Sequence, residues 1–364
     1  MTAPVKPRFV RPHVLELRPV AHGSVAAAEL AAFGLTPADV LDFSVNTNPL
    51  GPYPAVLRAV QDTDWTRYPG DDEAPLRSGL ARQSGVAPDN IALGNGSAEL
   101  LWLVALAVLQ PGDLVVVLGP TFGEYARAAR AVGAHVTEVR APTEVPPARL
   151  LFVCNPNNPT GTLVGRREIE LLLDEQPDRV VVLDEAYAAF VAERWRAEDL
   201  LRAYPNLIVL RSLTKDHALP GLRLGYLLAA PDVAGAVEAV RPPWSVNAGA
   251  LRAGLATLEP EAQAHVVRAR ALVATSRVLL TQGLTALGYA VRASTANFVL
   301  VNVGEATAFR RALLPHGIVV RDCTSFGLPA YVRIACRMPE HCTRLLDVVT
   351  SLRRTGTLTN LNST

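Results

Sequence analysis

The sequence is poor in the features that tie a protein to a membrane, to nucleic acid or to an oxidising compartment. Its 364 residues include only four cysteines, and no two of these form a Cys-x-x-Cys pair. That pattern argues against a structural metal and favours a reduced, cytoplasmic chain. No apolar run is long enough to cross a bilayer, and residues 1–7 lack the apolar core of a signal peptide. We therefore expect no membrane partner.

An excess of charge of either sign is also missing. The chain has 35 lysines and arginines against 34 aspartates and glutamates, which gives a net charge of +1. Because nucleic acids and anionic membranes attract basic patches, this balance gives no reason to expect either as a partner. Hydrophobic residues, in contrast, make up 49% of the chain. Length and composition indicate a globular protein with room for two domains.

Three polar motifs each follow an apolar run that is typical of a buried strand. The runs at 151–154, 180–183 and 207–210 lead into Asn155-Pro156-Asn157-Asn158-Pro159, Asp184-Glu185-Ala186-Tyr187 and Ser212-Leu213-Thr214-Lys215. A lysine at a strand end can be partly desolvated, which lowers its pKa and frees the amine as a nucleophile. Ser212, and Arg223 between two glycines, can donate hydrogen bonds to an anion. This combination favours an enzyme that forms a covalent imine beside a bound phosphate.

A fourth motif is a glycine-rich turn that precedes an apolar helix. A short strand at 91–93 enters Gly94-Asn95-Gly96-Ser97-Ala98-Glu99, and the helix is expected to run to residue 109. Unpaired N–H groups and the positive end of the helix dipole make such a turn attractive to phosphate. Ser97 as a plain N-cap is the alternative, and the two can both hold. Glu99 stands where a dinucleotide fingerprint has its third glycine, which argues against a dinucleotide.

The alternation of strands and helices predicts the fold class. Strands are expected at 113–118, 135–139, 150–154, 179–184 and 207–212, with a helix at 166–175. Such alternation is typical of an α/β fold with a mostly parallel sheet that helices cover on both faces. Ligands bind beyond the carboxyl ends of the strands in these sheets, where Asn158, Asp184 and Lys215 fall.

The rest of the chain predicts a second, smaller domain. We expect a large domain at 41–250, then a linking helix and a small α+β domain at 251–355. The elements of this last part would be a helix at 261–287, strands near 297–303, 318–321 and 331–336, and helices at 305–315 and 339–353. Residues 1–40 should form a proline-rich arm and a short helix at 25–33, with Ser24 as its N-cap. The polar residues 356–364 are expected to be disordered.

Together the motifs resemble those of the fold-type-I pyridoxal-phosphate (PLP) enzymes, specifically the class I/II aminotransferase family. The family has these motifs in the same order, each after an apolar strand. The resemblance implies a seven-stranded type of sheet and PLP as the cofactor. It implies that Lys215 holds PLP as an imine and then shuttles the proton, while Asp184 pairs with the pyridine nitrogen. Asn158 and Tyr187 would bind the 3-oxygen of the ring.

Further cofactor contacts follow from the same resemblance. Phe122 would stack on the pyridine ring, since a flat ring is held well by an offset aromatic face. The residues that would hold the phosphate are Gly96, Ser97, Ala98, Ser212, Arg223 and Tyr68. In the resembling enzymes a tyrosine in the setting of Tyr68 crosses to the partner subunit. The resemblance therefore implies a homodimer with shared active sites.

Within the family, the chain looks most like the threonine-phosphate decarboxylases of cobalamin biosynthesis, which are close relatives of the histidinol-phosphate aminotransferases. The similarity is clearest at residues 22–23, 44–52, 215–226 and 321–333. It implies a small amino-acid substrate held by His22, Gly23, Asn46, Asn158, Arg321 and Arg333. Two arginines suit a substrate that carries both a carboxylate and a phosphate.

The motifs leave the reaction open, because the same lysine and aspartate serve both transamination and decarboxylation. The first hypothesis is decarboxylation of O-phospho-L-threonine. The alternatives are a histidinol-phosphate aminotransferase or related transaminase and, more remotely, a non-enzymatic PLP-binding regulator. Two departures from the decarboxylase pattern bear on the substrate: Ser24 replaces a glycine, and Asp216-His217 replaces an apolar or aromatic pair. The acid and the imidazole would tune acid–base chemistry, recognise a different substrate or point to solvent.

Overall fold

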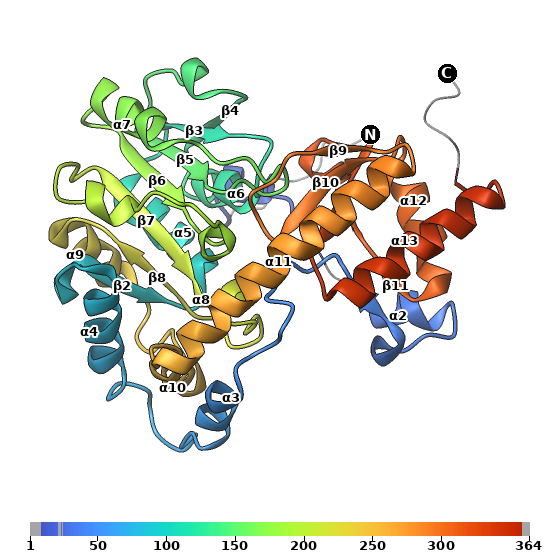
Figure 1. Cartoon of the computed structure of the whole chain (residues 1–364). Coiled ribbons are helices and arrows are strands. Elements are labelled where there is room, and N and C mark those ends of the chain that lie inside the picture. Colours follow the sequence, from blue (N-terminus) through green and yellow to red (C-terminus); the bar gives the residue numbers. More distant parts are fainter. Residues whose placement is uncertain (1–8, 21–22, 24, 359–364) are drawn as a thin grey trace.

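The structure is a computed structural model that describes residues 9–20, 23 and 25–358. Figure 1 shows a larger body built around one wide sheet, a smaller body beside it, and helix α11 (Pro260–Ala286) running from one to the other. Both sheets and the linking helix were expected. The domain boundaries stated above remain a prediction.

The large sheet has seven strands. They are β2 (Ile91–Gly94), β3 (Leu114–Leu118), β4 (His135–Val139), β5 (Leu150–Cys154), β6 (Val180–Asp184), β7 (Leu207–Ser212) and β8 (Gly225–Leu228), in the order β2-β8-β7-β6-β5-β3-β4. The two antiparallel pairings both involve β8, which lies between β2 and β7. The prediction of a mostly parallel sheet is therefore confirmed.

Helices cover both faces of this sheet, and the alternation of side chains along each strand supplies a core on each side. In β5, Leu151 and Val153 pack into one core, while Leu150 and Phe152 pack into the other. The first core is closed by α4 (Glu73–Ser84), α7 (Arg166–Glu175) and α10 (Ala248–Thr257). The second is closed by α5 (Ser97–Val108), α6 (Glu124–Ala131) and α9 (Pro231–Val240). The short helix α3 (Pro54–Gln61) packs against α10.

The smaller body contains an antiparallel sheet of four strands. These are β9 (Ala290–Arg292), β10 (Phe298–Asn302), β12 (Arg321–Asp322) and β13 (Tyr331–Ala335), in the order β12-β13-β10-β9. Helices α11, α12 (Ala306–Leu313) and α13 (Pro339–Arg354) contribute to the core beside it. A separate parallel pair joins β1 (Leu41–Asp42) to β11 (Ile318–Val319), which ties the segment before the large sheet to the small domain.

Three expectations need correction. The predicted strand at 318–321 is two strands, β11 and β12, which belong to different sheets. The helix predicted at 25–33 is α2 (Ala27–Ala31), whose N-cap is Ala26; Ser24, the predicted cap, lies outside the described residues. In the tail expected to be disordered, Leu358 is buried against the small-domain core because the chain turns back at Gly356, where φ is +75°. Residues 359–364 lie outside the described part.

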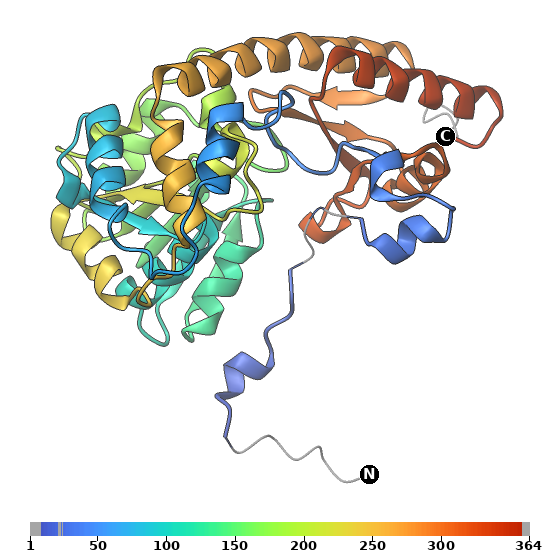
Figure 2. The ribbon, with the colours of Figure 1, turned by 90° about the horizontal axis from the view of Figure 1, so that it is seen from below.

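The described part of the arm, residues 9–20, has little regular structure. It contains one turn of helix, α1 (Pro12–Leu15), which packs against α6 at the edge of the larger body (Figure 2). Its prolines fix φ and remove backbone donors, which explains the mostly extended path.

Candidate active site

A cavity of about 470 Å³ opens where the carboxyl ends of the large-sheet strands face the small domain. It collects residues that are far apart in the sequence. Ten of the residues expected to bind cofactor or substrate line it: Gly23, Asn46, Ala98, Phe122, Asn158, Tyr187, Lys215, Arg223, Arg321 and Arg333. Their convergence follows from the rule that ligands of such sheets bind beyond the strand ends.

Lys215 lies on α8 (Leu213–Asp216), a single turn of helix that begins directly after β7. Its backbone carbonyl accepts a hydrogen bond from the Asn48 N–H at 2.8 Å, which fixes the turn to the segment after β1. Burial, followed by the nearby Arg333 and Arg223 guanidinium groups, lowers the pKa of Lys215 to about 8, against the opposing effect of Asp184. A sizeable fraction of the amine is therefore neutral near physiological pH, as a nucleophile requires.

The scarcity of lysine in the sequence is a further signal for the role of Lys215. Lys6 and Lys215 are the only lysines in the chain, and every other basic residue counted with them is an arginine. An arginine stays protonated in proteins and cannot supply a neutral primary amine. Retention of a lysine at the end of β7 therefore points to chemistry rather than to a surface charge.

Asp184 is the last residue of β6 and is buried. Its Oδ2 accepts a hydrogen bond from the Tyr125 hydroxyl at 2.8 Å, and its Oδ1 accepts one from the Ala186 N–H at 3.0 Å. Burial raises the pKa of the Asp184 carboxyl, whereas these two hydrogen bonds act in the opposite direction. A carboxylate held this way is suited to pair with a ring N–H that enters from the cavity.

Tyr125 is a residue that sequence reasoning missed. It lies on α6 one turn after Phe122, and its ring stacks on Phe152 of β5 with centroids 5.0 Å apart and planes 11° apart. Phe122 meets Tyr125 edge-on at 5.6 Å and lines the cavity. Phe122 precedes the first residue of α6, Glu124, so helical periodicity in the sequence gives no sign that the two rings meet.

Arg333 and Arg321 are brought together by strand pairing. They are direct cross-strand partners on β13 and β12, which places two like charges side by side. Arg333 is buried: Nη1 contacts Asn158 Oδ1, Nη2 donates to the Ser44 carbonyl at 2.6 Å, and the guanidinium lies over the Phe298 ring. Arg321 donates to Ser325 Oγ at 2.7 Å. An anionic substrate between the two would relieve their repulsion and receive several charge-assisted hydrogen bonds.

Tyr187 and Asn46 complete this side of the cavity. The Tyr187 ring meets Phe298 edge-on at 5.2 Å, and burial raises the pKa of its hydroxyl to about 12. The Asn46 carboxamide lies close to this hydroxyl, and neither its oxygen nor its nitrogen makes a hydrogen bond of normal geometry to a described residue. Since buried polar groups are rarely left without partners, Asn46 is suited to contact a ligand in the cavity.

A phosphate cradle forms at the start of α5. Gly96 is the N-cap of this helix, with φ of +79°, and a Cβ built there would lie 2.6 Å from Arg223 Nη2. A Cβ at Gly225 would lie 2.4 Å from the Ser97 nitrogen. The guanidinium therefore packs over a helix N-terminus in a way that only glycine permits. Ser97 is the first helical residue, so the reading of Ser97 as N-cap was wrong.

The cradle also includes Ser212 beside Lys215. Ser212 is the N-cap of α8, and its Oγ shares a hydrogen bond with Thr214 Oγ1 at 2.7 Å. The helix N-terminus, the Arg223 guanidinium and the amine of Lys215 together fit a PLP phosphate and aldehyde, with Asp184 suited to the pyridine nitrogen. The residues present thus suit this cofactor.

The structure does not bring the predicted residue Tyr68 to the cavity. Tyr68 is 79% exposed and stacks on Trp244, with ring centroids 4.4 Å apart. His22 lies outside the described residues, although its neighbour Gly23 lines the cavity.

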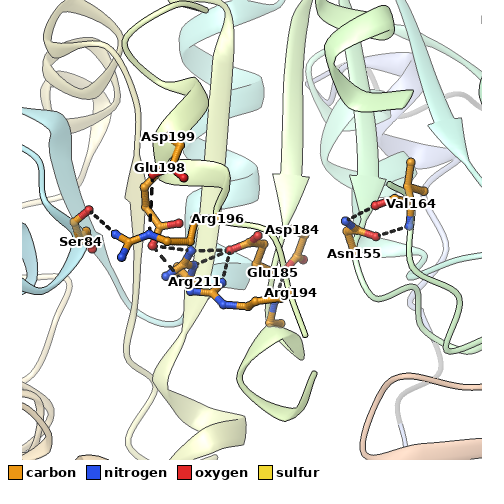
Figure 3. A network of polar contacts seen from close by, with 11 residues as sticks. Ser84, Asn155, Val164, Asp184, Glu185, Arg194, Arg196, Glu198, Asp199 and Arg211 are labelled. Carbon is orange, nitrogen blue, oxygen red and sulfur yellow. Dashed lines mark hydrogen bonds and ion pairs between the residues drawn. The ribbon is translucent and has the colours of Figure 1, made fainter. Parts of the chain in front are cut away.

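Asp216 and His217 face away from the cavity. Their side chains are 19% and 4% exposed and line a second cavity of about 240 Å³ beside α11, so the expectation that they might point to solvent was wrong. The same cavity is lined by Glu185, which accepts hydrogen bonds from Arg211 Nε at 2.7 Å and Arg194 Nη1 at 3.1 Å (Figure 3). This network lies behind Asp184 and holds the ends of β6 and β7 together.

The loop after β5 is fixed by Asn155. Its Nδ2 donates to the Val164 carbonyl at 3.1 Å, and its Oδ1 accepts from the Val164 N–H at 2.7 Å (Figure 3). Asn157 adds a hydrogen bond to the Pro120 carbonyl at 2.9 Å. These two amides position Asn158 at the cavity wall.

Comparison with known proteins identifies the family. The family model for aminotransferase class I and II matches residues 38–349. The chain belongs to this family. As a member of the aminotransferase family it is a PLP-dependent enzyme, in agreement with the geometry of the cavity. Within the residues described, no helix has both the length and the apolarity needed to span a membrane.

The similar aminotransferases span nearly the whole chain. Histidinol-phosphate aminotransferase 1 of Thiobacillus denitrificans is 36% identical, over 93% of this chain and 92% of that protein. Histidinol-phosphate aminotransferase of Symbiobacterium thermophilum is also 36% identical, over 93% and 97%.

Solved structures share the fold. L-threonine-O-3-phosphate decarboxylase from Porphyromonas gingivalis has a TM-score of 0.78 at 27% identity, covering 86% of this chain and 100% of that one. Histidinol-phosphate aminotransferase from Sinorhizobium meliloti, solved in complex with pyridoxal-5'-phosphate, has a TM-score of 0.81 at 24% identity, covering 96% and 99%.

Proposed function

We propose that this enzyme is a histidinol-phosphate aminotransferase, which moves the amino group of histidinol phosphate to a 2-oxo acid. The observation that carries the proposal is the 36% identity to relatives of that name across 93% of the chain. The paired arginines Arg321 and Arg333 support it, because they offer a phosphate-binding site within the same cavity as Lys215.

The proposed roles follow from the positions of the side chains. PLP, when bound, supplies an electron sink for the bond that breaks at the substrate's α-carbon. Lys215 would take the proton from that carbon and return it, for which a pKa of about 8 is well matched. Asp184 would keep the pyridine nitrogen protonated, while Asn158 and Tyr187 would hold the 3-oxygen. Arg223, Ser212 and the Gly96–Ala98 turn would hold the cofactor phosphate.

The substrate would be held on the small-domain side. Arg321 and Arg333 would bind its phosphate, with Gly23 and Asn46 beside them in the cavity wall. His22 is proposed for the same site from the sequence. Because Arg333 also donates hydrogen bonds to the Asn158 side chain and the Ser44 carbonyl, its guanidinium group is already oriented before the substrate binds.

Decarboxylation of O-phospho-L-threonine, the first hypothesis from the sequence, is now the second candidate. Its support is the likeness to the Porphyromonas gingivalis decarboxylase and the two arginines, which would also suit a carboxylate and a phosphate. Relatives that are 36% identical to this chain carry the histidinol-phosphate aminotransferase name and thus favour transamination.

We further propose a homodimer in the cytoplasm. Tyr68 and Trp244 stack on the surface and are 79% and 54% exposed, which is unusual for large aromatic side chains unless a partner covers them. In the dimer Tyr68 would reach the cofactor phosphate of the partner subunit. All four cysteines are free and buried, as a reducing compartment allows.

The test is a comparison of two substrates with the PLP-loaded enzyme. With histidinol phosphate and 2-oxoglutarate, we expect glutamate to form continuously. When 2-oxoglutarate is omitted, we expect the reaction of histidinol phosphate to stop after a single turnover. With O-phospho-L-threonine we expect no carbon dioxide. Release of carbon dioxide from phosphothreonine without an acceptor, together with no glutamate from histidinol phosphate, would establish the second candidate instead.

A further inference from the structure

The helical turn that carries Lys215 needs support from outside itself. α8 spans only Leu213–Asp216, and a helix this short cannot pair its last carbonyl groups internally. The chain bends sharply directly afterwards, because Ala218 has a φ of +53°, a conformation that costs energy for a residue with a Cβ. The Ala218 N–H reaches the Lys215 carbonyl only at 3.4 Å. The position of Lys215 therefore depends on contacts from another segment of the chain.

Asn48 supplies such contacts. Its backbone N–H donates to the Lys215 carbonyl at 2.8 Å, and its side-chain Nδ2 donates to the next carbonyl, that of Asp216, also at 2.8 Å. The side-chain Oδ1 accepts a hydrogen bond from the Leu50 N–H at 2.8 Å, which orients the carboxamide. Asn48 is 2% exposed, so water has little access to these bonds. Two neighbouring donors thus hold the last two carbonyl groups of α8.

The segment that leads to Asn48 is tied to the small domain at its other end. The Phe43 carbonyl accepts a hydrogen bond from the Ala335 N–H of β13 at 2.9 Å. The Ser44 carbonyl accepts one from Arg333 Nη2 at 2.6 Å. This segment therefore connects the strand of the proposed substrate arginine to the turn of the proposed catalytic lysine, and the substrate has to reach both.

We propose that Asn48 is a positioning residue that acts through Lys215, because its side chain holds the end of α8 where the lysine amine can reach the reacting carbon. The inference rests on the role proposed for Lys215 and adds the residue that fixes its place. Proton transfer requires hydrogen-bond reach, and a misplacement of about 1 Å can cost about a hundredfold in rate. Since the side-chain bonds of Asn48 go to Asp216 and Leu50, their loss should affect the chemical step more than substrate binding.

The first measurement separates kcat from KM. The PLP-loaded proteins are assayed with whichever of histidinol phosphate and O-phospho-L-threonine the wild type converts. Asn48→Ala should lower kcat at least about tenfold and leave KM within about twofold. Asn48→Ser keeps an oxygen that can accept from the Leu50 N–H but is too short to reach the Asp216 carbonyl, so its kcat should fall as well. The serine variant decides the test if the alanine variant does not fold.

A matched control lies at the opposite edge of the large sheet. Asn90 directly precedes the amino end of β2, whereas the cavity lies beyond the carboxyl ends of the strands. Its Nδ2 donates to the Ala229 carbonyl at 2.7 Å, and its Oδ1 accepts from the Ala87 N–H at 3.2 Å, so it makes the same two kinds of bond as the Asn48 side chain. Asn90→Ala should leave both kcat and KM within about twofold of the wild type.

The second measurement follows Lys215 itself in the apoprotein and needs neither cofactor nor substrate. Burial, followed by the two neighbouring guanidinium groups, lowers its pKa to about 8. A loosened turn admits water, so the pH midpoint for reaction with an aldehyde reagent, read on the Lys215 peptide by mass spectrometry, should rise to about 9 or above in Asn48→Ala. Asn90→Ala should keep the midpoint of the wild type.

The possible results distinguish this inference from the role on which it rests. If kcat and the Lys215 midpoint of Asn48→Ala equalled those of Asn90→Ala, the assignment of Asn48 would be overturned. Wild-type behaviour of Asn48→Ser would also overturn it, because the bond to Leu50 would then account for the whole effect. If the wild type formed no borohydride-stable PLP adduct on Lys215, the role proposed for this lysine would itself be wrong.

Discussion

Replacement of Tyr125 by phenylalanine tests the arrangement around Asp184. The variant keeps the ring, and so the 5.0 Å stack on Phe152, but loses the hydroxyl that donates to Asp184 Oδ2 at 2.8 Å. Because that oxygen is buried, leaving it unsatisfied should destabilise the apoprotein by about 1–3 kcal/mol. Urea denaturation of the apoprotein measures this change.

A matched control is available in the small domain. The hydroxyl of Tyr289 is buried and has no hydrogen-bond partner among the residues that the structure describes, and its ring meets Phe309 edge-on at 5.7 Å. Tyr289→Phe removes the same atom without breaking a hydrogen bond, so its stability should equal or exceed that of the wild type.

Tyr125→Phe should also change the pH dependence of stability and lower the activity. Burial already raises the pKa of Asp184 above its ordinary value of 3.8 in the folded state, so ionisation costs stability as the pH rises through that interval. Loss of the Tyr125 hydrogen bond raises the pKa further and enlarges this cost. A smaller fraction of Asp184 is then ionised at a given pH and able to pair with the ring N–H of the cofactor, and one pKa unit corresponds to about 1.4 kcal/mol, or up to a tenfold lower kcat. If Tyr125→Phe matched Tyr289→Phe in both stability and kcat, the reasoning would be refuted.

Three further predictions concern the cavity. Reaction of the apoprotein with an aldehyde reagent should accelerate with pH and level off above about pH 8, because burial lowers the pKa of Lys215 to that value; a midpoint near 10 would contradict it. Gly96→Ala should weaken PLP binding at least roughly tenfold in a cofactor titration, since the new Cβ would lie 2.6 Å from Arg223 Nη2, whereas Gly34→Ala, with a similar positive φ and no atom within 4 Å, should not. Arg333→Lys should raise the KM for histidinol phosphate at least about tenfold, because a lysine cannot form the two parallel hydrogen bonds of a guanidinium group. Arg292→Lys on the exposed side of the same sheet should leave this KM unchanged.

Much of the large sheet could be predicted because its strands are nearly continuous apolar runs between turn signals. The expected strands at 135–139, 150–154 and 207–212 coincide with β4, β5 and β7. Asn158, Asp184 and Lys215 could be placed at one edge by topology alone. The small domain was harder, because Val320 separates two-residue strands that pair with different sheets, and no local pattern shows such a division.

Parts of the site depend on contacts between distant segments and had no local signature. The direct pairing of Arg321 with Arg333 depends on the register of β12 on β13. The burial of His217 depends on the packing of α11 beside α8, and α11 lies some fifty residues later in the chain. The hydrogen bond from Tyr125 to Asp184 joins residues 59 positions apart. In each case the residue type is visible in the sequence, while its partner is set by the tertiary fold.

The most direct test of the account is borohydride reduction of the PLP-loaded protein followed by peptide mass spectrometry. The chain has only two lysines that could form the adduct, Lys6 and Lys215. The account predicts a stable cofactor adduct on Lys215 alone, and a colourless, unlabelled protein after Lys215→Ala. An adduct confined to Lys6, or no adduct on the wild type after incubation with PLP, would contradict it.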